Sequence, residues 1–194
     1  MNMVPEPRAA VVTLEWEYIS AANANAAGGF KPVRAAFLDI DGACGSFTDT
    51  SDVDAPEGMT VFKLSMEETW NATMAGDVLT TFTHVHDGGV LLETTRNGKV
   101  VCATVPVYGG DPAFIDPLPP GTTHDHGHDA DGTGYAKGLA HVSHMPDCDD
   151  LTRIEVGDQW SVVATYNFTE RPPMMDHHGN PVPIMGITGL YFVE

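Results

Sequence analysis

Two histidines separated by one residue are the part of this sequence best suited to chemistry. His84 and His86 lie in the run Thr83-His84-Val85-His86-Asp87-Gly88-Gly89. In a β-strand, residues i and i+2 point to the same face, so the two imidazoles can bind one metal ion. The two glycines that follow place the pair near a strand end, where a partly open site can form. The run predicts a metal site, with a pair of surface histidines on an exposed strand as the alternative.

Met185 is the candidate for a third ligand. It stands at the entry of the apolar run from Ile184 to Val193, which is typical of a buried strand. Two imidazoles and a thioether favour copper. Core packing is the alternative role for Met185, because most methionines in apolar strands pack in the interior.

His141 is the candidate for a fourth ligand or a nearby group. It lies in the segment from Gly138 to Met145, together with His144. The two histidines are an odd number of residues apart, so in a regular strand they face opposite ways. At most one of them is expected to line the same site.

A second metal site is a further prediction, in a loop rich in histidine and acidic residues. Its candidate ligands are His124, His126 and His128. Imidazoles and carboxylates at this density can bind Zn²⁺, Cu²⁺ or Ni²⁺. His177 and His178 in a later loop are a similar candidate. Solvated polar loops collect the same residue types, so the sequence leaves both alternatives open.

Short β-type segments separated by Gly, Pro, Asn and Asp must position these residues. They predict an all-β fold, a jelly-roll-like antiparallel β-sandwich of about nine strands with two long His-rich loops. Strands are expected at residues 10–19, 33–40, 60–64, 77–86, 89–95, 100–105, 138–145, 159–167 and 184–193. Asn97-Gly98 predicts a tight hairpin turn, and residues 111–134 and 169–183 are expected to be the loops. We expect a single domain over residues 1–194.

The chain is strongly acidic, with 27 Asp and Glu against 9 Lys and Arg and a formal net charge of -18. Such a charge repels nucleic acid and anionic membrane surfaces, so neither is an expected partner. No apolar run is long enough to span a bilayer, and the first residues lack the basic and apolar pattern of a secretory signal. We expect such a signal to be absent or already removed.

The cysteines and the glycosylation sequons indicate in which cellular compartment the protein is located. Cys44, Cys102 and Cys148 have no CxxC spacing, which argues against a zinc ribbon or a dithiol redox site. The sequons at Asn71 and Asn167 suit a secreted glycoprotein. These features favour an extracellular protein with one disulfide.

Other chemistries have less support in the sequence. Asp39 to Gly42 and residues 49–54 are similar to calcium-binding loops, but the full twelve-residue ligand pattern is not present. The sequence also has no nucleophile elbow, P-loop or dinucleotide fingerprint. Covalent hydrolase chemistry therefore has no visible support.

Several blocks occur in a characteristic order along the chain. They are Lys31-Pro32-Val33 through Phe37-Leu38-Asp39-Ile40, His84 to Gly89, Gly98 to Cys102, Val105 to Gly109, His144 to Cys148 and Met185-Gly186-Ile187. In this order they resemble the stress-upregulated nodulin family and, more distantly, the second copper domain of peptidylglycine α-hydroxylating monooxygenase. The resemblance covers most of the chain from about residue 31 onward.

The resemblance implies a ligand set and a disulfide. It implies that His84, His86 and Met185 bind one copper ion, as the corresponding His-x-His strand and last-strand methionine do in the monooxygenase. It also implies a disulfide between Cys102 and Cys148, which leaves Cys44 unpaired.

The leading hypothesis is an extracellular mononuclear copper-binding protein that sequesters, buffers or delivers copper. The alternative is a copper-dependent monooxygenase or oxidase that activates oxygen with electrons from an external reductant. In that case oxygen and a small-molecule substrate are partners. The sequence assigns no catalytic residue and no oligomeric state.

Two weaker alternatives come from other classes of protein. A cupin-like metalloenzyme also starts its metal motif with His-x-His, but Glu93 lies seven residues beyond His86. The cupin glutamate would lie about four or five residues beyond, on a different strand face. The last alternative is a non-catalytic adhesion or stress protein in which the histidines are incidental.

Overall fold

The structure is a computed structural model that describes residues 9, 11–26, 28–42, 53–115, 140–148, 151, 153–175 and 180–194. Contacts divide the chain into two units, residues 1–32 and residues 33–194. In the first unit, α1 spans Ala21–Ala26. Every strand found in the described residues belongs to the second unit.

The predicted strand at residues 10–19 is not formed over its described part. Residues 11–20 have no regular secondary structure. The alternation of Leu14, Trp16 and Tyr18 with polar residues is genuine, but these side chains are largely exposed. An alternating pattern alone does not make a strand, because a strand also needs a partner for its backbone.

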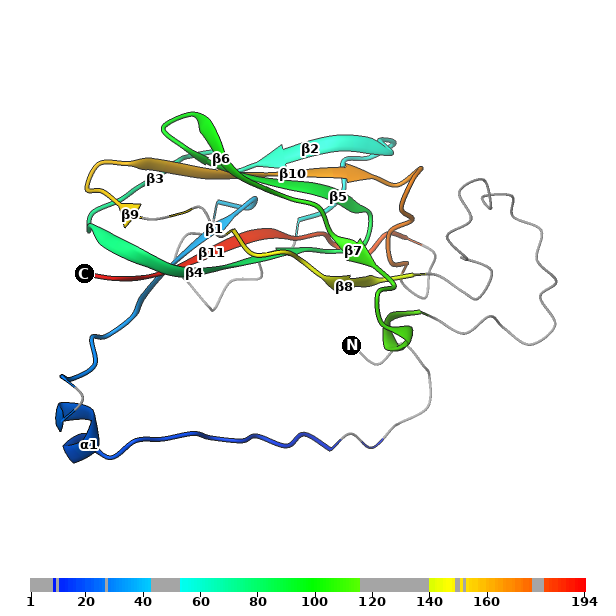
Figure 1. The fold of residues 1–194 in the computed structure, drawn as a ribbon. Helices are drawn as coiled ribbons and strands as arrows, with labels where there is room; N and C mark the ends of the chain where they lie inside the picture. The colour runs from blue at the N-terminus through cyan, green and yellow to red at the C-terminus, as the bar shows by residue number, and fades with distance from the viewer. Residues whose placement is uncertain are drawn as a thin grey trace. The chain divides into compact units, whose positions relative to one another are not determined.

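The second unit is a sandwich of two antiparallel sheets (Figure 1). The first sheet has four strands in the order β1-β11-β4-β9. Their bounds are β1 Arg34–Asp39, β11 Gly186–Val193, β4 Gly76–Val85 and β9 Arg153–Ile154. The last strand of the chain therefore lies in the middle of this sheet, between its first strand and the strand that carries His84.

The second sheet has five strands, in the order β2-β10-β5-β6 with β3 also paired to β10. Their bounds are β2 Val61–Ser65, β10 Gln159–Asn167, β5 Gly89–Arg96, β6 Lys99–Thr104 and β3 Trp70–Asn71. Asn97 and Gly98 join β5 to β6 with φ angles of 52° and 75°. These positive angles confirm the predicted Asn-Gly hairpin turn.

The core lies between the two sheets. On β10 every second side chain is fully buried, as Trp160, Val162 and Ala164 illustrate. Leu190 and Phe192 of β11 are also fully buried in the same cluster. The outward-facing residues of β11 are left to line the other face of the four-stranded sheet, where the candidate site lies.

A two-stranded sheet stands beside this sandwich. It pairs β7, Val107–Tyr108, with β8, Val142–His144. The short 3-10 helix η1, Pro112–Phe114, follows β7 (Figure 1). Of the predicted strand at residues 138–145, the described part contains only β8.

The prediction of an all-β sandwich is confirmed, and the remaining predicted strands coincide with strands of the structure to within a few residues. Three strands of two residues each, β3, β7 and β9, were not predicted, because two residues are too few to show an alternating pattern. The prediction of one domain over the whole chain stays a prediction. Among the described helices, none is long and apolar enough to cross a membrane.

Candidate metal centre

His84 and His86 lie at the end of β4, on the outer face of the four-stranded sheet. Thr83 and Val85 are buried on the inner face, whereas both histidines are half-buried. The two imidazole rings lie 5.3 Å apart between centres and are nearly perpendicular, at 86°. Because a metal–imidazole bond is only about 2 Å long, rings at this separation can both reach one ion. The structure thus has the same-face arrangement that the sequence predicts.

Met185 lies directly beside His86 across the β4–β11 pair. The strand register pairs Gly186 with Val85 and Ile187 with His84. The His86 N–H donates to the Met185 carbonyl oxygen at 3.3 Å, which continues this register by one residue. Since Gly186 faces the interior, alternation puts Met185 on the outer face with the two histidines.

The orientation of the His86 ring is fixed by a backbone carbonyl. Its Nδ1 lies 2.8 Å from the Pro183 carbonyl oxygen. A carbonyl oxygen only accepts hydrogen bonds, so Nδ1 carries the proton in this contact. The neutral ring then presents the lone pair of Nε2, which is the state a metal ligand requires.

An uncharged strip continues along the outer face from His84. The Phe82 ring stacks on the His84 ring at 6.2 Å and 8°, and Phe82 is 44% exposed. The register then aligns Phe82, Gly189 and Phe37 across three strands. A Cβ added at Gly189 would lie 3.2 Å from the Phe37 ring and 3.5 Å from the Phe82 ring. The two aromatic rings therefore pack closely over Gly189, where a side chain would crowd the Phe37 ring.

Tyr108 stabilises the turn that follows the histidines through two hydrogen bonds. Its hydroxyl accepts from the Gly88 N–H at 3.0 Å and donates to the Gly89 carbonyl at 2.7 Å. Burial raises the pKa of Tyr108, and the nearby Asp87 carboxylate raises it further. The hydroxyl therefore keeps its proton at ordinary pH and can serve both backbone groups at once.

Asp87 connects the same turn to His141. The side chain of Asp87 is almost fully buried, and one carboxylate oxygen contacts His141 Nδ1 in a short hydrogen bond. The other oxygen accepts from the Val142 N–H at 2.8 Å. His141 is thereby linked to the residue next to His86, and its Nε2 is not used in this contact. The structure thus ties the predicted fourth group to the site through Asp87.

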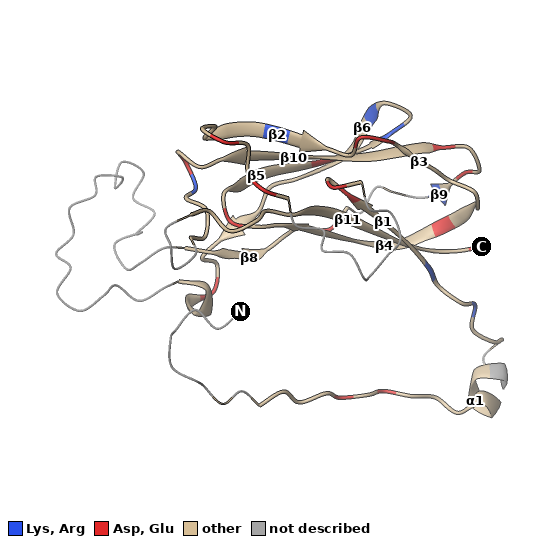
Figure 2. Cartoon of the chain, turned by 180° about the vertical axis from the view of Figure 1, so that it is seen from behind, with Lys and Arg blue, Asp and Glu red and all other residues tan. Residues whose placement is uncertain are grey.

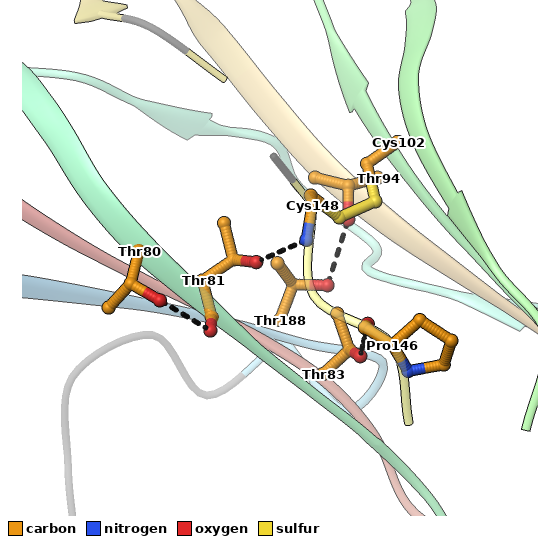
Figure 3. The surroundings of a disulfide bond; sticks show 8 residues. All are labelled: Thr80, Thr81, Thr83, Thr94, Cys102, Pro146, Cys148 and Thr188. Atoms are coloured by element: carbon orange, nitrogen blue, oxygen red, sulfur yellow. Dashed lines mark hydrogen bonds between the residues drawn. A yellow bond between two sulfur atoms is a disulfide. The ribbon is translucent and has the colours of Figure 1, made fainter. Parts of the chain in front are cut away.

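The segment from residue 140 to residue 148, here called the strap, is held at its other end by a disulfide. Cys148 is bonded to Cys102 of β6, which agrees with the pairing that the resemblance implied. The Cys148 N–H donates to the Thr81 hydroxyl at 2.8 Å, and the Thr83 hydroxyl donates to the Pro146 carbonyl at 3.0 Å (Figure 3). The strap is therefore fastened to both sheets of the sandwich.

Several predicted site residues lie outside the described part of the chain. These are His124, His126 and His128 of the predicted second site, His177 and His178, and Cys44. Within the described ranges, no three His, Cys, Asp or Glu side chains gather closely enough to hold an ion. A centre at His84 and His86 built from described residues thus needs a donor of another type. Met185, whose backbone contacts His86, stays the predicted one.

Sequence reasoning missed the groups that support the histidines, namely Asp87, Tyr108 and Tyr166, whose hydroxyl accepts from the His86 N–H. A signal for Tyr166 was present, because it ends the alternating run of β10 on the inward-facing positions. A tyrosine buried there must find a partner for its hydroxyl. The identity of that partner depends on the packing of the two sheets, which the sequence does not display.

Acidic residues are spread over the described loops and strands, while basic residues are few (Figure 2). The strand β11, which carries the outward-facing row beside the histidines, has no charged residue. The negative charge of the chain favours cations near the molecule. Asp39 of β1 pairs with Ile187, which in turn pairs with His84, so an acidic residue lies in the same row as this histidine.

Comparison with known proteins links the chain to copper enzymes. Over 111 residues, 57% of this chain, it is 34% identical to a probable copper-dependent oxygenase M1 of Phoma sp. and, over the same share, to a probable copper-dependent oxygenase clz3 of Cochliobolus lunatus. The chain spans only about a quarter of the length of these relatives, with matches to 23% and 29% of them. No protein-family model matches the chain, and no solved structure matches it either. These relatives support a relationship to copper oxygenases, and membership of the nodulin family stays a prediction.

Proposed function

We propose that residues 33–194 form the copper-binding part of an oxygenase that activates oxygen with an external reductant. His84, His86 and Met185 would hold one copper ion. The observation that carries the proposal is that the two imidazole rings lie 5.3 Å apart and that the His86 N–H donates to the Met185 carbonyl oxygen. Strand alternation then puts the Met185 side chain on the same face as the rings. The copper-dependent oxygenases to which the chain is similar favour this function over copper storage or delivery.

The donor set fits copper in both of its oxidation states. Imidazoles bind Cu(II) and Cu(I), and a thioether is a soft ligand that favours Cu(I). The ring of His86 is already oriented by Pro183 and would not have to reorganise to bind. Bound copper would supply the one-electron chemistry that allows dioxygen to react with a substrate.

The aromatic row beside the site favours a substrate with an apolar surface. Phe82 and Phe37 flank Gly189 in a row next to His84, and no described residue of β11 is charged. A substrate with an apolar surface would gain by covering the Phe82 ring. In a monooxygenase turnover, one oxygen atom would enter a C–H bond of this substrate and the other would leave as water. An external reductant would supply the two electrons and two protons.

An extracellular location is part of the proposal. The disulfide between Cys102 and Cys148 supports it, because such bonds persist in oxidising compartments. Sequestration, buffering or delivery of copper is the second candidate function, since the same ligands would serve it.

Oxygen consumption distinguishes the two functions. Copper-loaded protein, freed of unbound metal by a desalting step, would be mixed with ascorbate and followed with an oxygen electrode. An oxygenase is expected to consume several equivalents of oxygen per copper, and a His84→Ala variant treated in the same way should consume none above background. Stoichiometric copper binding without such turnover would instead favour the carrier.

A further inference from the structure

We propose that the Tyr166 hydroxyl is the positioning group that holds His86 and Met185 at a fixed separation in the candidate centre. The inference rests on the proposed copper site, but it concerns a residue outside the ligand set. Tyr166 lies on β10, in the sheet opposite the histidines, and its side chain is fully buried. It therefore acts on the centre from the core side.

The contacts of this hydroxyl form a closed triangle. It donates to the Met185 carbonyl oxygen at 2.5 Å and accepts from the His86 N–H at 3.3 Å. The same His86 N–H lies 3.3 Å from the Met185 carbonyl oxygen. Strand pairing by regular register ends one residue earlier, at Val85 and Gly186. Two of the proposed ligands thus stand just beyond the ends of their strands, where the hydroxyl binds the backbone of both.

The two sheets approach each other closely at this point, which lets Tyr166 reach across. A Cβ added at Gly186 would lie only 2.7 Å from the Cβ of Ala164. Ala164 is two residues before Tyr166 and faces the same way on β10. Gly186 is adjacent to Met185, so the close approach and the hydroxyl contact occur at the same place in the molecule.

The tyrosine ring has little freedom to move. It stacks on Phe62 at 5.5 Å and 11°, and Phe168 packs edge-on against it at 6.0 Å. The hydroxyl is consequently a fixed point, and both ligand-bearing segments are placed relative to it.

Loss of this fixed point should affect one oxidation state of copper more than the other. Without the hydroxyl, Met185 can shift relative to His86, and the thioether is the ligand that favours Cu(I). Cu(I) affinity should therefore fall more than Cu(II) affinity, which lowers the reduction potential of the bound copper. A role limited to overall stability would not change the ratio of the two affinities.

The test is Tyr166→Phe, which keeps the ring and its stacking on Phe62. The matched control is Thr94→Val, which also removes a buried hydroxyl that bridges the five-stranded sheet to β11, through Thr188 at 2.8 Å (Figure 3). Cu(I) and Cu(II) affinities would be measured by competition with chromophoric chelators. Tyr166→Phe is expected to weaken Cu(I) binding about tenfold and Cu(II) binding less, and Thr94→Val to leave the ratio unchanged. If the ratio of Cu(I) affinity to Cu(II) affinity were the same in Tyr166→Phe as in Thr94→Val, the proposal would be wrong.

A measurement on the unmodified protein covers the case in which Tyr166→Phe fails to fold. The His86 amide lies beyond the last regular strand pair, where its N–H donates to the Tyr166 and Met185 oxygens. Amide hydrogen exchange of His86 is expected to be as slow as that of the amides inside β4, whereas rapid exchange would contradict a fixed triangle. If the unmodified protein binds no copper, the proposed function fails, but the exchange result still decides whether the triangle exists.

Discussion

Gly88 occupies a backbone position that other residue types can adopt only with strain. Its φ angle is +92°, and a Cβ added there would lie 2.5 Å from a ring carbon of Phe168. The same residue donates its N–H to the Tyr108 hydroxyl. The turn after His86 therefore depends on a glycine for its conformation and for the close approach of a neighbouring ring.

The substitution Gly88→Ala should lower the free energy of unfolding by about 3 kcal/mol, because backbone strain and overpacking add. The matched control is Gly98→Ala, at φ +75° with no neighbouring atom within 4 Å of the added Cβ. This variant meets backbone strain alone, which costs about 1 kcal/mol. Urea unfolding of both variants measures the difference. Equal losses would show that the Phe168 ring moves aside without cost.

The two histidines and Met185 differ in how well the sequence predicts their positions. The same-face placement of His84 and His86 follows from a local rule, the period of two in a strand, and the structure has it. Placing Met185 beside His86 needs the pairing of two strands that are about a hundred residues apart in the chain, which no local pattern encodes. The resemblance to a known copper domain supplied that information instead.

At the scale of elements, the strap is a cross-connection between the two sheets. Its first part is held by Asp87, at the end of β4, and its last part by the disulfide to β6. Neither anchor belongs to the proposed ligand set. The strap therefore contributes mainly to the stability of the sandwich, and it fixes the position of His141.

Removal of the disulfide by Cys102→Ala with Cys148→Ala should lower the free energy of unfolding by about 4 kcal/mol. The bond closes a loop with a sequence separation of 46, and this value follows from the loop entropy that it removes from the unfolded chain. Copper affinity should change little, because His84, His86 and Met185 lie on β4 and β11 or next to them. Urea unfolding with and without a reductant checks the expectation. A reduced unmodified protein as stable as the oxidised one would contradict it.

The strands show where an alternating sequence pattern is enough to predict structure. The longer strands from residue 33 onward were predicted because their alternation coincides with burial on one face, as along β10. Residues 11–19 alternate equally well, but no strand in the described part of the chain pairs with them, because pairing is a property of the sheet rather than of the segment. The two-residue strands β7 and β9 exist only through their neighbours.

At the scale of the whole molecule, stability should depend on pH at both extremes. Burial raises the pKa values of Tyr108 and Tyr166 above their ordinary value of about 10. Burial alone would raise the pKa of Asp158, but hydrogen bonds from the Glu155 N–H, Asn97 and Arg96 lower it below its ordinary value. The tyrosines and this carboxylate thus act on opposite sides of the pH range.

The signs of the two effects differ. The tyrosine contribution is fully present below about pH 10 and decreases as pH rises above it, because unfolding then releases protons. The Asp158 contribution is present above about pH 4 and is lost as pH falls through the lowered pKa. Unfolding free energies measured from pH 2 to pH 11 should therefore fall at both ends. Asp158→Asn should flatten the acid side only, and an unchanged acid side in this variant would contradict the assignment.

The acidic character of the whole molecule was evident from composition, and it argues against nucleic-acid partners. Composition could not reveal that an aromatic row lies beside the two histidines. That property arises from the register of three strands, which brings Phe37, Gly189 and Phe82 into one row.

X-ray absorption spectroscopy of the protein loaded with one equivalent of Cu(I) tests the proposed centre most directly. The fine structure reports the types of atom bound to copper. We expect two imidazole nitrogens and one sulfur in the unmodified protein, and loss of the sulfur in Met185→Leu with the nitrogens retained. A spectrum without sulfur in the unmodified protein, or an unchanged sulfur signal in Met185→Leu, would contradict a centre made of His84, His86 and Met185.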